Sequence, residues 1–226
     1  MRAPSEAGQR PRLLDLFSGA GGCAVGYHRA GFDVVGVDIR PQPRYPFEFH
    51  QADALEFVEQ HGHEFDAIHA SPPCQVFSPL SYRWGANEYP DLVDATRAAL
   101  RATGLPYAIE NVMRAPLYQS LVLCGSMFDG LRVIRHRRFE CNPPLWFPPF
   151  SCSHPRGAVG RRGHLGDREW ITVTGHFSNS EKARAAMGID WMNQEELAQA
   201  IPPAYTEFVG RHLMRAVVEE ARHAAV

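Results

Sequence analysis

Apolar and polar positions in the first half of the chain follow two different periods. Continuous apolar runs predict buried strands at residues 13–17, 32–38, 65–70 and 106–109. Helical spacing predicts helices at residues 23–30, 54–61 and 91–103. Strands that alternate with helices are typical of an α/β fold, in which helices cover both faces of a mostly parallel sheet. We therefore predict this fold class for the chain.

The pattern changes after residue 121. Residues 131–139 predict an edge strand or hairpin, and residues 170–174 predict a further strand. Residues 142–168 contain many prolines and glycines, which predict a loop.

Two helices are predicted towards the C-terminal end of the sequence. One begins at Ser180, a plausible cap, and the other at Pro202-Pro203, after which apolar residues recur at helical spacing. We expect one main domain, made of residues 1–141 and 169–226, that is interrupted by a small loop-rich insertion at residues 142–168.

Composition places the chain among globular proteins of a reducing compartment. With 226 residues, of which 45% are hydrophobic, it is long enough for one well-buried domain. Five cysteines are an odd number and suit free thiols better than a disulfide framework. The sequence contains no apolar run of membrane-spanning length and no secretion signal at its start, so we expect a cytoplasmic protein without membrane contact. The net charge of −2 predicts no general attraction to nucleic acid, although arginines accumulate between residues 132 and 168.

The tetrapeptide Pro72-Pro73-Cys74-Gln75 follows the predicted strand at residues 65–70. Ligands of open α/β sheets bind beyond the carboxyl ends of the strands, so Cys74 is expected to face the reaction cleft. A free cysteine is more often a small buried hydrophobe, and Cys74 alone would not decide between these interpretations.

A glycine-rich turn, residues 18–22, separates the first predicted strand from the first helix. Such a turn lets the backbone approach a ligand closely, and Asp38, at the end of the second strand, can accept hydrogen bonds from ribose hydroxyls. Asp53 is placed to receive an adenine amino group at the same cleft. The glycine spacing departs from the dinucleotide fingerprint, which favours a nucleoside cofactor without a long pyrophosphate.

Glu110 follows the predicted strand at residues 106–109, so its carboxyl group should converge with Cys74 at one edge of the sheet. A thiol with a carboxylic acid suits nucleophilic addition to an electron-poor ring whose nitrogen the acid holds. Arg135 and Arg137 alternate on the predicted edge strand and would share a face, from which one or both could reach this site.

The order of these motifs resembles the cytosine C5 DNA methyltransferases that use S-adenosylmethionine. The resemblance rests on residues 15–22, 71–78, 110–112, 135–137 and 198–203. It implies a Rossmann-like methyltransferase fold and C5 methylation of cytosine in DNA, with the base flipped out of the duplex. Cys74 would add to C6 of cytosine, Glu110 would hold N3, and Arg137, with Arg135 nearby, would neutralise charge on O2. Positions expected to contact the cofactor are Phe17, Ser18, Gly19, Ala20, Gly22, Asp38, Ile39, Asp53, Ala54, Pro73 and Gln199.

Three features depart from the family pattern. Val133 stands where the family usually has Gln, and Ala198-Gln199-Ala200-Ile201 stands where it usually has Gly-Asn-Ala-Val. The target-recognition region is reduced to about residues 142–168. A positioned helix, ribbon or set of loops is needed to read several base edges, so we expect short or relaxed sequence specificity, or a partner that supplies it. Residues 76–89 are the expected closing loop.

Two alternatives remain open at this stage. In the first, the acceptor is a pyrimidine in RNA or a free nucleotide. In the second, the chain is a catalytically silent nucleic-acid-binding regulator. The biological settings considered are restriction-modification, phage defence and regulation. Cys141, Cys152, His154 and His164 raise the question of zinc, but their spacing matches no standard pattern, and the sequence assigns no metal site.

Overall fold

The computed structural model describes residues 9–77, 90–154, 170–173, 177 and 180–224. Within these residues seven strands form one sheet in the order β3-β2-β1-β4-β5-β7-β6. The strands are β1 (Arg12–Leu16), β2 (Asp33–Asp38), β3 (Glu48–Gln51), β4 (Ala67–Ala70), β5 (Tyr107–Asn111), β6 (Leu121–Leu123) and β7 (Arg137–Asn142). The helices are α1 (Gly22–Arg29), α2 (Ala54–His61), α3 (Val93–Thr103), α4 (Ser180–Met187), α5 (Gln194–Gln199) and α6 (Pro203–Ala224).

The sheet is mostly parallel and its strand order reverses at one point. Strands β1 to β5 pair in parallel, whereas β7 lies antiparallel between β5 and β6. From β1 the chain proceeds outward to β2 and β3, and then returns to the other side of β1 as β4. In such sheets ligands bind beyond the carboxyl ends of the two strands that flank this reversal, here β1 and β4. The predicted Rossmann-like α/β fold is confirmed.

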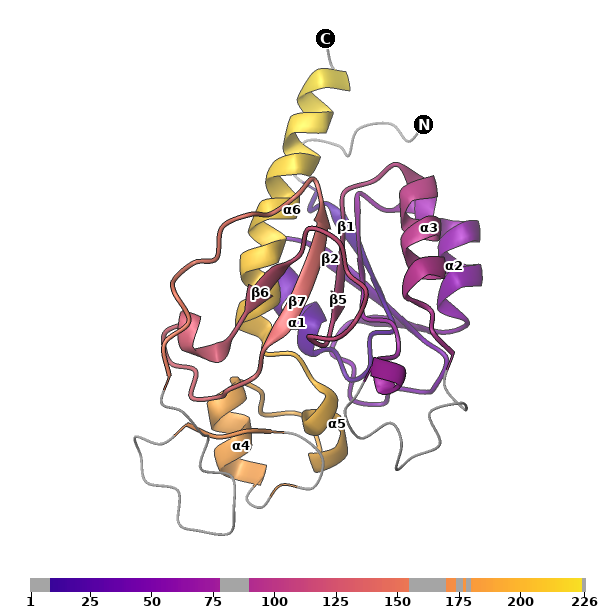
Figure 1. Cartoon of the computed structure of the whole chain (residues 1–226). Coiled ribbons are helices and arrows are strands. Elements are labelled where there is room, and N and C mark those ends of the chain that lie inside the picture. The colour runs from indigo at the N-terminus through magenta and orange to yellow at the C-terminus, as the bar shows by residue number, and fades with distance from the viewer. Residues whose placement is uncertain (1–8, 78–89, 155–169, 174–176, 178–179, 225–226) are drawn as a thin grey trace.

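Helices cover both faces of the sheet, as Figure 1 shows, with α1 and α6 on one face and α2 and α3 on the other. Successive residues of β1 supply the two cores, because side chains of a strand point alternately to opposite faces. Leu13 packs with α1 and α6, whereas Leu14 packs with α2 and α3. Helices α1 and α6 approach very closely: a Cβ atom at Gly26 would lie 2.1 Å from the hydroxyl oxygen of Thr206.

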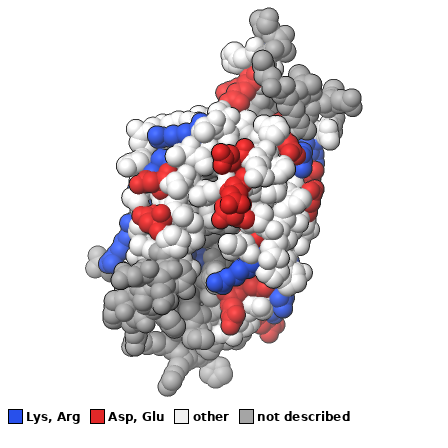
Figure 2. Space-filling model, turned by 90° about the vertical axis from the view of Figure 1, so that its right-hand side faces the viewer, with Lys and Arg blue, Asp and Glu red and all other residues white. Residues whose placement is uncertain are grey.

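Charges on the face formed by α2 and α3 are mixed. Figure 2 shows acidic side chains in the middle of this face, with basic ones scattered around them. Exposed acidic residues of the two helices include Glu56, Glu59 and Asp94. Binding of a DNA backbone requires positive charge on the protein surface, so this described face is a poor candidate for the nucleic-acid surface.

The predicted elements of the first half agree with the structure to within two residues at most ends. The second half differs in three respects. Residues 131–136 are not part of a strand, because β7 begins only at Arg137 and pairs with a short strand, β6, that the pattern did not predict. Ile171 forms only an isolated bridge with Val133 in place of the predicted strand, whose residue 174 lies outside the described residues. Helix α5 was also missed.

No described helix is both long enough and apolar enough to cross a membrane. All five cysteines are free thiols, as predicted.

Candidate active site

Cys74 lies beyond the carboxyl end of β4, at the reversal point of the sheet. The backbone N–H of Ser71 donates to the Leu16 carbonyl over 3.1 Å, which aligns the ends of β4 and β1. The side-chain amide of Asn111, at the end of β5, donates to the Pro72 carbonyl over 2.9 Å. Proline has no backbone N–H to donate, so hydrogen bonds of the sheet cannot fix this turn. The side chain of Asn111 stabilises it instead. The thiol of Cys74 is half-buried at this position.

Glu110 and Arg137 form a nearly buried ion pair beside this turn. Glu110 is the fourth residue of β5 and pairs with Phe139 of β7, so Arg137, two residues before Phe139, is its diagonal neighbour on the same face. Arg137 Nε lies 3.0 Å from Glu110 Oε1, and the two side chains are 15% and 7% exposed. Despite this short separation Oε1 receives no hydrogen bond of acceptable geometry, and it remains a buried acceptor without a donor.

The charges of these three groups are coupled. Burial raises the pKa of the Glu110 carboxyl, whereas Arg137 and a hydrogen bond from Ser71 act in the opposite direction. Burial also raises the pKa of the Cys74 thiol, Glu110 raises it further, and Arg137 and Arg135 lower it. The three predicted groups are therefore close enough to influence one another's charge, and the raised pKa of Cys74 favours its protonated thiol. Added positive charge, or protonation of Glu110, would favour its thiolate.

Arg135 differs from its prediction. It precedes β7, so it does not share a strand face with Arg137. Its guanidinium donates to the carbonyls of Val173 and Ala198, and its own carbonyl accepts a 2.7 Å hydrogen bond from the Tyr205 hydroxyl. Burial lowers the pKa of Arg135 to about 9, which still leaves it charged at neutral pH. These bonds connect the segment before β7 to α5 and α6.

A buried hydrogen-bond chain behind Glu110 was not predicted. The Tyr27 hydroxyl lies 2.8 Å from His69 Nδ1, and His69 Nε2 lies 2.9 Å from the Ser71 hydroxyl, which in turn hydrogen-bonds Glu110. No role was predicted from the sequence for the histidines outside the proline-rich loop. Their pattern held one usable signal, because His69 lies within an otherwise apolar strand that leads to Cys74.

This chain predicts a pH-dependent loss of stability. Burial lowers the pKa of His69 to about 3 from a usual 6.5, so between these values the folded state binds fewer protons than the unfolded state. The contribution of His69 to the free energy of unfolding is therefore fully present above pH 6.5, and it decreases as the pH falls towards 3. Between about pH 7 and pH 5 the free energy of unfolding should fall by about 2 kcal/mol more in the wild type than in His69→Gln. Urea unfolding measures this difference, and the exposed His63→Gln serves as control; equal pH slopes for the wild type and His69→Gln would contradict it.

The glycine-rich turn forms the other wall of the site. Phe17 and Gly19 have left-handed φ values of 56° and 48°, and a Cβ at Gly19 would meet no atom within 4 Å, so the turn is open there. Asp38 accepts hydrogen bonds from the backbone N–H groups of Gly19 and Arg40, each over 3.0 Å. Ile39 is 66% exposed, which leaves an apolar side chain free beside the turn.

The remaining predicted contacts surround this turn. Asp53 caps α2 and uses only Oδ1 for its bonds to Leu55 N and Glu56 N. The C-terminal part of the chain also contacts the turn. Trp191, which precedes α5, donates a hydrogen bond from its indole N–H to the Ala20 carbonyl over 2.9 Å. A Cβ at Gly22 would lie 2.6 Å from the Ile201 carbonyl oxygen, which explains the glycine. Gln199, at the end of α5, is exposed. The open turn, the carboxylate and the free apolar side chain fit a nucleoside-containing cofactor.

Part of the chain matches a known protein family. Residues 12–112 match the family model of C-5 cytosine-specific DNA methylases. This match contains the glycine-rich turn, Cys74 and Glu110. The match places residues 12–112 in the C-5 cytosine-specific DNA methylase family. Type II methyltransferase M.HgiDI of Herpetosiphon aurantiacus is 30% identical over 192 residues, which are 75% of this chain and 62% of that protein. Type II methyltransferase M.AquIA of Picosynechococcus is 29% identical over 119 residues, 45% of this chain and 48% of that protein.

The chain thus spans less than two thirds of the length of these relatives. Solved structures agree with the methylase fold. A protein described as a DNA modification methyltransferase, encoded within an E. coli prophage, aligns with a TM-score of 0.63 at 15% identity, over 92% of this chain and 99% of its own. The S. pombe Dnmt2 methyltransferase aligns with a TM-score of 0.56 at 12% identity, with the same coverage. At such identities the likeness supports the fold alone.

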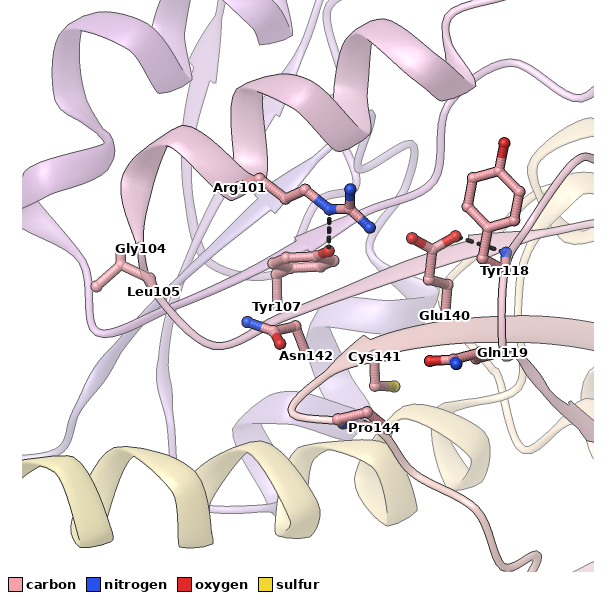
Figure 3. Close-up of a pocket in the computed structure, with 10 residues that line it drawn as sticks. All are labelled: Arg101, Gly104, Leu105, Tyr107, Tyr118, Gln119, Glu140, Cys141, Asn142 and Pro144. Carbon is pink, nitrogen blue, oxygen red and sulfur yellow. Dashed lines mark hydrogen bonds between the residues drawn. The ribbon is translucent and has the colours of Figure 1, made fainter.

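The cavity in Figure 3, about 180 Å³, lies away from the candidate active site. It borders Tyr107 at the start of β5, three residues before Glu110, and Asn142 at the end of β7. Its wall contains Glu140, which forms a buried ion pair with Arg97, 2.7 Å between Nε and Oε1. The cavity is at the amino end of the parallel strands, whereas ligands of this fold bind at the carboxyl end.

Proposed function

We propose that this chain transfers a methyl group from S-adenosylmethionine to C5 of cytosine in DNA. The observation that carries the proposal is the convergence of Cys74 with the Glu110–Arg137 pair at the reversal point of the sheet, next to the open glycine turn. The family membership of residues 12–112 supports it. A thiol, a buried carboxyl with a raised pKa and a guanidinium are the three groups that this reaction needs.

Residues of the glycine turn and of the ends of β2 and β4 would hold the cofactor. Asp38 would accept hydrogen bonds from the ribose, Ile39 would pack against the adenine, and Asp53 would accept from its amino group through Oδ2. Phe17, Ser18, Gly19, Ala20 and Gly22 would line the turn, and Ala54, Pro73 and Gln199 would complete the site. When bound, the cofactor supplies an electrophilic methyl group on a positively charged sulfur.

Cys74, Glu110 and Arg137 would act on the cytosine ring. Cys74, after loss of its thiol proton to water, would form a bond from Sγ to C6. C5 then becomes electron-rich enough to accept the methyl group as the bond between that group and the cofactor's sulfur breaks. Glu110, whose pKa burial raises, would in its protonated form donate a hydrogen bond to N3 and stabilise the adduct. Arg137 would balance negative charge on O2. A base then removes the C5 proton, the C6–S bond breaks, and Cys74 returns as the leaving group.

The acceptor we propose is duplex DNA whose target cytosine is flipped into the site. Residues 76–89 would form the closing loop and residues 142–168 the reduced recognition element, joined to the catalytic domain of residues 1–141 and 169–226. Residues 78–89 and 155–169 lie outside the described part of the chain. Such a short recognition element supports short or relaxed sequence specificity, or a partner subunit. We place this activity in the cytoplasm.

Transfer of labelled methyl groups from S-adenosylmethionine to DNA tests this function. We expect 5-methylcytosine as the product after digestion to nucleosides, and bisulfite sequencing of the methylated DNA would give the flanking bases. Matched tRNA and free cytidine nucleotides serve as competing acceptors. Product on the N4 amino group, or transfer only to RNA or nucleotide, would contradict the proposal. DNA binding without transfer, and without a trapped adduct on DNA that contains 5-fluorocytosine, would favour a silent binding protein.

A further inference from the structure

Four side chains that could hold a metal ion converge beside the last two strands. Cys124 follows β6, His136 precedes β7, and Cys152 and His154 lie on the segment after β7. Their ligand atoms all lie within 4.8 Å of one another. In a tetrahedral zinc site with two sulfur and two nitrogen ligands, the ligand atoms are about 3.3–3.8 Å apart. The four groups therefore need only small rotations to surround one ion.

Individual contacts show the same convergence. Cys152 Sγ lies 3.5 Å from His136 Nε2, and the imidazole rings of His136 and His154 pack edge to face with centroids 5.3 Å apart. The Ser126 hydroxyl donates to Cys152 Sγ over 3.5 Å and accepts from the backbone N–H of Ser153 over 3.2 Å. Hydrogen bonds of this kind orient ligands around a metal.

We propose that Cys124, His136, Cys152 and His154 bind one structural zinc ion. Two thiolates and two imidazoles in a tetrahedral arrangement are a donor set that zinc prefers. Four protein ligands leave no open position, which indicates a structural role. This set replaces half of the one considered from sequence: Cys141 is buried in the core with α6, and His164 lies outside the described residues.

The site would join segments that are far apart in the sequence. Cys124 is fully buried next to β6, whereas Cys152 is exposed, so zinc would fasten the segment after β7 to the edge of the sheet. Trp170, the next described residue after His154, packs against its ring, with centroids 6.4 Å apart. Both ends of the intervening segment therefore meet at the zinc site.

The site would also support the candidate active site. The His136 carbonyl accepts a 3.0 Å hydrogen bond from Arg137 Nη1, and Arg137 pairs with Glu110. A metal bond to His136 would restrict the backbone that holds this arginine. Zinc would thus act as a positioning element between the segment after β7 and the Glu110–Arg137 pair.

Metal analysis of the untagged protein, purified without chelators, tests the proposal. We expect one zinc per chain by mass spectrometry and, in the denatured protein, five free thiols for the five cysteines. Cobalt-substituted protein should show thiolate-to-metal charge transfer and the intense visible bands of a tetrahedral site. No bound metal, or only three free thiols because Cys124 and Cys152 form a disulfide, would overturn it.

Single substitutions locate the site. Cys152→Ser and His154→Ala should each reduce zinc content at least about fivefold and lower the midpoint of thermal unfolding. Cys152 is exposed, so its substitution should not prevent folding. Cys141→Ala and His164→Ala are the matched controls and should keep one zinc per chain. Full zinc content in the first pair, or its loss in the control pair, would overturn the assigned ligands. Zinc content is read independently of methyl transfer, so this result does not depend on the proposed activity.

Discussion

The Cys74→Ala variant is expected to lose methyl transfer to DNA by about 10⁴-fold or more, because no other described group at this site can form the covalent bond to C6. Cys74 is half-buried and lies in a turn held by Asn111, so removal of its sulfur should leave the fold intact. Binding of S-adenosylmethionine should change little, since the glycine turn and Asp38 are untouched. Single-turnover transfer and isothermal titration with the cofactor measure the two quantities.

Two controls separate this effect from general damage. Cys141→Ala removes a buried thiol from the core beside α6 and should keep transfer near the wild-type rate. Asp38→Ala should show the opposite pattern to Cys74→Ala, with weaker cofactor binding as the primary defect. Transfer retained in Cys74→Ala would refute Cys74 as the nucleophile, whatever the other variants show.

Glu110→Gln is expected to reduce the rate of transfer by about 10²–10⁴-fold, the usual effect of a general acid. Glutamine keeps the shape of the side chain but cannot protonate N3, and it leaves Arg137 without its carboxylate. Burial raises the pKa of Glu110, so the protonated form is present at low pH and is lost as the pH rises through that raised pKa. The wild-type rate should therefore contain a falling limb that the variant lacks. Pre-steady-state rates measured across the pH range test this.

The control is Glu140, a buried carboxyl on the neighbouring strand β7. Glu140 pairs with Arg97 near the cavity of Figure 3. Its cross-strand partner is Ile109, so its side chain points to the opposite face of the sheet from that of Glu110. Glu140→Gln should lower stability, because it removes the buried carboxylate that pairs with Arg97, but it should keep the rate per folded molecule and its pH profile. An unchanged pH profile in Glu110→Gln would instead show that a group other than Glu110 causes the falling limb.

Local sequence was sufficient for most of the first half of the fold, although β3 was not among the predicted strands. There the apolar runs are continuous, helices separate them, and each strand end carries a recognisable residue, so β1, β2, β4 and β5 were predicted with Cys74 and Glu110 at one edge. The second half was harder to predict because its strands are short. Residues 131–136 alternate like a strand, but Arg135 turns to the carbonyls of Val173 and Ala198, far away in the sequence. No local period encodes such a partner.

The sequence by itself determined the α/β class, the order of the motifs and the family, because these depend on residue types at short spacing. The convergence of Cys74 with Glu110 was also predicted, but the tertiary structure alone determined the other contacts. Cys74 and Glu110 are brought together by parallel pairing of β4 with β5, and His69 joins them only because its strand is buried between two others. Cys124 and His136 approach Cys152 and His154 because antiparallel β6 and β7 bring distant segments to one edge. Contacts of this kind depend on how distant segments of the chain pack together, which the spacing of residues along the sequence does not encode.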